Sequence, residues 1–133
     1  MASTIDPPEL LVETREELAR FVELLPMLLA GLEGAIWRAR PSPVEWSPVE
    51  IVCHLRDEEV DDFGARLRVI LTGGARFAPN DPEQNAVTRH YREADPAVAL
   101  AAFDTHRRAT LDLLAAAPPE RLAGTAERPN GGR

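Results

Sequence analysis

Apolar residues recur at helical spacing in three long stretches of the chain. The first stretch follows Asp6 and Pro7, which suit the cap and the first position of a helix, and Thr14 offers a second candidate start. Its apolar positions are Leu18, Phe21, Val22, Leu25, Leu28, Leu29 and Leu32. Pro26 falls inside this pattern, so the sequence predicts a kink or a new turn there.

The second stretch begins at Ser47. Ser47 and Glu50 have the spacing of a capping box, and Gly73 and Gly74 are typical helix terminators, so we expect a helix over about residues 47–71. On a wheel of about 100° per residue, its apolar stripe contains Val52, Leu55, Phe63, Leu67 and Ile70.

A third helix is predicted from Asp95 and Pro96 to the prolines at 118 and 119. Its apolar positions are Leu100, Phe103, Leu111 and Leu114. Residues 77–95 read as a long connection with one short helix over 83–92, and no segment alternates as a strand would. The sequence therefore predicts one all-α domain over residues 1–133, a bundle of up to three long helices and a short one.

Composition narrows the classes of function and location. The net charge of −7 argues against nucleic-acid binding, which needs a basic face. The one cysteine cannot form an internal disulfide, which suits a reducing cytoplasm. No signal peptide is evident at the N-terminus, and no apolar run approaches the ~20 residues of a membrane span.

Charged residues interrupt the apolar stripes of the last two helices. Glu59 and Arg66 fall within the stripe of the second helix, where an unpaired charge would cost several kcal/mol. Seven residues separate them, so each needs a partner elsewhere or a wet cavity. Arg107 lies in the stripe of the third helix, four residues from both Phe103 and Leu111. Arg107 is therefore either the buried partner of Glu59 or an anion clamp in a pocket.

A histidine and several carboxylates share one side of the second helix. Asp57, Glu58 and Asp61 follow His54 at offsets of three, four and seven residues. This group suits either a divalent cation or a hydrogen-bonded acid–base pair, and a solvated helix surface is the alternative. Cys53 points to a different side and is best explained as a small buried residue.

The same segment resembles a known family. Its residues run Trp46-Ser47-Pro48-Val49-Glu50-Ile51 and then His54-Leu55-Arg56-Asp57-Glu58-Glu59. This order is similar to the pattern W-S-x-x-E-[IV]-x-x-H-L-x-D-x-E of the DinB-like superfamily, in its YfiT-type branch. The resemblance extends more weakly over about residues 10–133.

The resemblance implies a four-helix bundle that holds a divalent metal, zinc or nickel, through three histidines. His54 matches the ligand on the second helix, and the other two ligands belong to an H-x-x-x-H motif on a fourth helix. Asp57, Glu58, Glu59 and Arg107 would then support that ligand or bind substrate. The implied activity is that of a thiol S-transferase or a hydrolase-like enzyme, whose substrates are a small-molecule electrophile and a low-molecular-weight thiol.

The chain departs from the family in its C-terminal part. It has no H-x-x-x-H motif, and it ends at Arg133, about where the family's last helix would start, so we expect a C-terminally incomplete domain. Three explanations stay open: a truncated product, a homodimer that covers the exposed face, or a different site built from His90, His106 and the carboxylates near His54. The alternative to an enzyme is a non-catalytic helical interaction or dimerisation module with a degenerate metal site.

Overall fold

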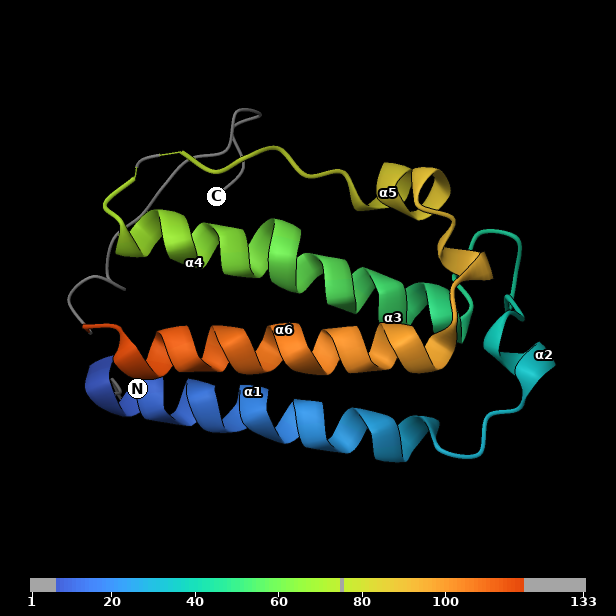
Figure 1. The fold of residues 1–133 in the computed structure, drawn as a ribbon, viewed down its shortest axis with the longest axis horizontal. Coiled ribbons are helices and arrows are strands. Elements are labelled where there is room, and N and C mark those ends of the chain that lie inside the picture. Colours follow the sequence, from blue (N-terminus) through green and yellow to red (C-terminus); the bar gives the residue numbers. More distant parts are fainter. Residues whose placement is uncertain (1–6, 75, 119–133) are drawn as a thin grey trace, which may run out of the picture.

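Three long helical segments form the body of the protein. The computed structural model describes residues 7–74 and 76–118, and every element in these ranges is helical. α6 (Pro96–Ala116) lies in the middle and packs against α1 (Pro7–Leu29) and α3 (Pro48–Asp57), which continues through η1 (Glu58–Phe63) into α4 (Gly64–Leu71) (Figure 1). The all-α class expected from the sequence is confirmed.

The shorter elements are α2 (Gly34–Trp37), α5 (Pro82–Thr88) and η2 (Tyr91–Glu93). The single short helix expected over residues 83–92 is divided into the last two of these. His90 separates them with a φ of 52°, in the left-handed region that interrupts a helix. In the described ranges, no helix is both long and apolar enough to span a bilayer.

α1 is one uninterrupted helix. It begins at Pro7, so the second candidate start at Thr14 is wrong, and it continues through Pro26 to its end. Pro26 lies three residues before the end of α1, and its missing N–H removes one helical hydrogen bond, the one to the Val22 carbonyl. The expected cap, Asp6, lies outside the described residues.

The start of α3 confirms the predicted capping box. Ser47 is the N-cap, and its backbone N–H and its hydroxyl donate to Glu50 Oε1 at 3.1 and 2.9 Å. The Arg40 guanidinium donates to both oxygens of Glu50 at 2.8 Å. These hydrogen bonds, the one from Arg40 first, lower the pKa of Glu50 to about 2 despite its burial. The carboxylate thus fixes the preceding loop to the first turn of α3.

The helix that continues from α3 contains a turn of π-helix at Glu58–Phe63. In a π turn an N–H bonds the carbonyl five residues earlier in the chain instead of four, and here the Gly64 N–H donates to the Glu59 carbonyl. The prediction that Phe63 belongs to the core stripe is wrong, because its side chain is 38% exposed and Gly64 lies buried in its place. The extra residue of the turn rotates every later side chain relative to a regular α-helix.

Two apolar clusters fill the interior. Val22 and Leu25 of α1 pack with Phe103 of α6. The second cluster joins α3 to α5, η2 and α6, and contains Val49, Val52, Cys53, Ala86, Tyr91 and Ala99. The half-buried Trp37 and Trp46 pack against it, so α5 and η2 are held on α3 through apolar contacts.

Gly64→Ala should destabilise the fold. A Cβ atom at this position would lie 2.1 Å from the Glu59 carbonyl oxygen, so the π turn would have to shift or straighten. We expect a loss of about 1–3 kcal/mol in the free energy of unfolding, measured by urea titration with far-UV circular dichroism. Gly34→Ala is the matched control, because no atom lies within 4 Å of its added Cβ. Equal stability of the two variants would contradict the assignment of Gly64 to the turn.

Candidate functional site

His54 lies near the end of α3 and is partly accessible. Its side chain is 29% exposed, and its ring centroid is 5.0 Å from that of Trp46. Partial burial lowers the pKa of His54 and favours the neutral imidazole. A neutral imidazole is the form that binds a metal or accepts a proton.

Glu58 is the carboxylate that lies next to His54. Its Oε1 atom is 3.8 Å from His54 Nδ1, as the spacing of four residues predicted. The same oxygen accepts a hydrogen bond from Asn80 at 3.0 Å, and Asn80 accepts one from Asn85 of α5 at 3.2 Å. The segment before α5 therefore holds Glu58 in place beside the imidazole.

Asp57 and Asp61 are engaged by Arg89. The Arg89 guanidinium lies 2.9 Å from Asp57 and 2.6 Å from Asp61. Asp57 also accepts hydrogen bonds from Arg56, at 2.8 Å, and from the Tyr91 hydroxyl. Burial opposes ionisation of Asp57, but these donors outweigh it and lower its pKa. The two carboxylates thus fasten the segment around η2 to α3 and η1.

Glu59 and Arg107 form a buried ion pair. The distance from Arg107 Nη2 to Glu59 Oε1 is 2.6 Å. The side chain of Arg107 is 9% exposed and that of Glu59 is 3% exposed. Arg107 also donates to the Leu18 carbonyl of α1 at 3.2 Å, and its guanidinium lies over the rings of Phe21 and Phe103. The interpretation of Arg107 as the buried partner of Glu59 is confirmed. The pair joins α1, η1 and α6.

Arg66, the other cation in an apolar helical stripe, has different partners and is less buried. Its guanidinium carbon lies 4.9 Å from the centroid of the Phe77 ring, and its Nη1 is 3.8 Å from Asp62. Its side chain is 35% exposed, so water shares in solvating the charge.

The described residues do not assemble the alternative site expected from His90 and His106. Within the part of the chain that the structure describes, no group of three or more His, Cys, Asp or Glu side chains is placed to hold a metal ion. His90 is exposed on the connection between α5 and η2, and His106 is on α6. His54 and Glu58 are therefore the donors that the described chain brings together.

Cys53 is fully buried, which confirms its interpretation as a small core residue. Its Sγ atom is 3.8 Å from the Tyr91 carbonyl oxygen, and burial raises the pKa of its thiol. A raised pKa leaves the thiol uncharged and unreactive near neutral pH.

Sequence reasoning missed the partners that come from the connection. Asn80, Arg89 and Tyr91 contact Glu58 or Asp57 across more than twenty residues of sequence. The residues Asn80-Asp81-Pro82 are typical of a turn. Helical spacing, however, says nothing about contacts between elements.

A sequence model described as the DinB superfamily matches residues 11–133. The chain belongs to the DinB superfamily. No curated protein matched the chain in a sequence search.

The DinB fold is also found in a solved structure, YfiT from Bacillus subtilis. The two structures superpose with a TM-score of 0.86 at 16% sequence identity, and the match covers 100% of this chain and 75% of the other. YfiT is described as a probable metal-dependent hydrolase with an unusual four-helix bundle topology. At this identity the match establishes the shared fold of this DinB chain.

Arg107→Met should destabilise the DinB fold strongly, because it leaves Glu59 buried without its cation. We expect a loss of about 3–5 kcal/mol in unfolding free energy, measured by urea titration. The double variant Glu59→Leu/Arg107→Met should recover part of this loss, since no charge then stays buried. Arg108→Met is the control, because Arg108 is 51% exposed and water screens its surface ion pairs, so their loss should change stability little. A loss for Arg107→Met no larger than that of the control would refute the role of the pair.

Proposed function

We propose that this chain is a divalent-metal-dependent enzyme, hydrolase-like or a thiol S-transferase, in which His54 is one metal ligand. The observation that carries the proposal is a neutral, partly exposed imidazole at the histidine of the family motif, with Glu58 beside its Nδ1 atom. Metal-bound histidines commonly donate their second ring N–H to such a carboxylate, which fixes the tautomer and the ring orientation. The description of YfiT as a probable metal-dependent hydrolase supports the same chemistry.

The donors in the described ranges are fewer than a zinc or nickel site needs. Zinc sites use three or four protein ligands, and the structure brings one imidazole together with one carboxylate here. A complete site therefore requires donors from residues outside the described ranges or from a second chain. Imidazole is a ligand typical of both zinc and nickel, which are the metals we propose.

Each residue around His54 has a definite part in this proposal. Glu58 Oε1, 3.8 Å from Nδ1, would accept the Nδ1–H once the two groups move into hydrogen-bond distance, so that Nε2 would be the atom left to bind the metal. Asn80 holds Glu58 in position. Asp57 keeps Tyr91 and Arg89 close to this side of α3. A bound divalent metal would lower the pKa of a coordinated water or thiol and so supply a nucleophile for a small-molecule electrophile. Because Cys53 is buried, a thiol-dependent reaction would take a low-molecular-weight thiol as its second substrate.

His54→Ala should abolish stoichiometric binding of zinc or nickel and leave the helical circular dichroism signal intact. Binding is measured as metal retained per chain after dialysis, and by calorimetric titration. Because burial lowers the pKa of His54, protons should compete with the metal only below the ordinary histidine pKa of about 6.5. His90→Asn is the control, since asparagine tolerates the left-handed backbone at that exposed position. Metal retention by the His54 variant, or its loss from the control alone, would show that the ligand is misassigned.

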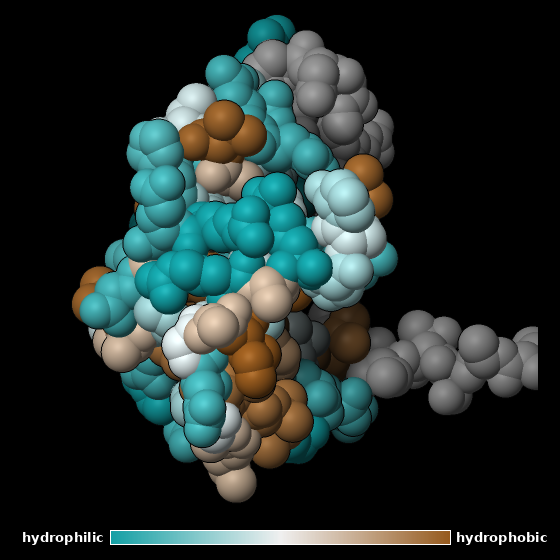
Figure 2. Space-filling model, turned by 90° about the vertical axis from the view of Figure 1, so that its right-hand side faces the viewer, coloured by the Kyte–Doolittle hydropathy of each residue, from teal (hydrophilic) through white to brown (hydrophobic). Residues whose placement is uncertain are grey.

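The second candidate function is a homodimerisation module with a degenerate metal site. Its support is an apolar face on α1, where Leu24, Met27 and Leu28 are 44%, 71% and 73% exposed at the spacing of one helix face. Leu28, one of the apolar positions at helical spacing in this segment, is thus exposed and not part of the core. Figure 2 views the molecule from the right-hand side of Figure 1. It shows hydrophobic residues gathered in the lower half of that side, at the level of α1. Exposed apolar groups of this kind commonly mark contact surfaces.

Met27→Glu/Leu28→Glu should convert such a dimer to a monomer, because dimer formation would bury two carboxylates in an apolar contact. The measurement is molar mass by sedimentation velocity over a range of concentrations. Val87→Glu is the control, because Val87 is 74% exposed on α5, which packs on α3 and lies on the opposite side of the molecule from α1 in Figure 1. A wild-type mass that stays monomeric at all concentrations would exclude this function, and it would leave residues outside the described ranges as the source of the missing metal ligands.

A further inference from the structure

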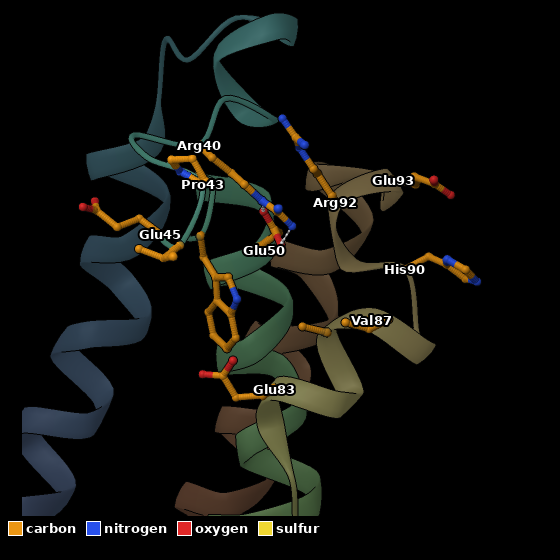
Figure 3. A pocket seen from close by; sticks show the side chains of 12 residues that line it. Arg40, Pro43, Glu45, Glu50, Glu83, Val87, His90, Arg92 and Glu93 are labelled. Atoms are coloured by element: carbon orange, nitrogen blue, oxygen red, sulfur yellow. Dashed lines mark hydrogen bonds and ion pairs between the residues drawn. The ribbon is translucent and has the colours of Figure 1, made fainter.

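A pocket of about 440 Å³ opens at the end of the bundle that carries α2 and α5. It is large enough for a small organic molecule. The loop before α3 forms one wall, and α5 with η2 forms the other (Figure 3). The lining residues are Arg40, Pro43, Val44, Glu45, Trp46, Glu50, Glu83, Ala86, Val87, His90, Arg92 and Glu93. His54 is not among them, but the ring of the lining residue Trp46 lies 5.0 Å from the His54 ring, so the pocket adjoins the proposed metal site.

The charges of the pocket favour a cation. Arg40 and Glu50 neutralise each other through their two 2.8 Å hydrogen bonds, and Figure 3 shows this pair in the middle of the pocket. The remaining charged lining residues are three carboxylates, Glu45, Glu83 and Glu93, and one guanidinium, that of Arg92. The Arg92 Nε–H donates to the Arg38 carbonyl at 2.9 Å. The net charge of the pocket lining is therefore negative, and so is the net charge of the whole chain, which is −7.

Glu83 is the carboxylate best placed to meet a ligand. In Figure 3, Glu45, His90 and Glu93 point outward, whereas Glu83 lies at the end of the pocket opposite Arg92. Among the described residues, Glu83 has no hydrogen bond or ion pair. Its charge is therefore available to an incoming group.

The walls near Glu83 are apolar and aromatic. Val44 and Val87 are 90% and 74% exposed, so each keeps most of its apolar surface in water. Trp46 is half-buried and lines the same pocket. An indole ring is the side chain that binds organic cations best through its π face. A ligand with an ammonium group and an apolar body would thus cover exposed apolar surface and meet a free carboxylate.

We propose that this pocket binds a small organic cation, a protonated amine with an apolar or aromatic body. The ammonium group lies between Glu83 and Trp46, and the apolar body packs on Val44 and Val87. A bare metal ion is a poor alternative, because no group of three metal-binding side chains exists in the described part of the chain. The proposal does not require a metal at His54, and cation binding is measured separately from metal binding.

The probe that tests this proposal is 2-phenylethylammonium chloride. Two-dimensional ¹H–¹⁵N spectra resolve the indole N–H signals of the two tryptophans, and Trp46→Phe assigns that of Trp46. We expect a saturable shift of the Trp46 signal below about 10 mM probe, weakening with added salt. The neutral 2-phenylethanol and the anionic 3-phenylpropionate should bind at least about 3–5-fold more weakly.

Two variants separate a specific site from general attraction. Glu83→Gln should weaken binding of the ammonium probe about 3–5-fold, while Glu16→Gln on the exposed surface of α1 should leave it unchanged. Val87→Lys, at an exposed position, should weaken the ammonium probe further and strengthen 3-phenylpropionate. Tighter binding of the carboxylate by the wild-type protein, an unchanged affinity in Glu83→Gln, or no saturable binding of the ammonium probe would each overturn the proposal.

Discussion

The buried ion pair between Glu59 and Arg107 is the contact on which the arrangement of the long helices depends. It places one charge from η1 and one from α6 in the interior, and Arg107 reaches the Leu18 carbonyl of α1 as well. A misaligned helix would leave a desolvated charge unpaired, which costs far more than an imperfect apolar contact. The pair therefore selects one register for three helices, where apolar packing alone would tolerate several.

The π turn at Glu58–Phe63 begins beside Glu59 and changes which later residues of this helix face the interior. Helical spacing in the sequence correctly predicted the long helices, the capping box at Ser47 and the start of α6 at Asp95. It could not predict the π turn, because hydropathy reports which residues are apolar and not which carbonyl each N–H binds. Gly64 was the local signal, since the close approach of the Glu59 carbonyl leaves no space for a side chain there.

In the candidate site, too, contacts within one helix could be predicted from the sequence, whereas contacts between elements could not. The proximity of Glu58 to His54 follows from a spacing of four residues and was predictable. The engagement of Asp57 by Tyr91, and of Glu58 by Asn80, depends on how the connection folds back onto α3. Membership of the DinB superfamily adds a reason to regard His54 as a metal ligand, and the described side chains supply only part of a ligand set.

Cys53 is the one thiol of the chain, and it is enclosed between α3 and η2. A water-soluble thiol reagent can reach it only when these elements separate. The rate of its modification therefore reports how often η2 leaves α3, which is a local opening equilibrium and not global unfolding. The protein thus carries a natural internal reporter for the stability of the segment that holds Asp57, and its signal can be read without introducing a label by mutation.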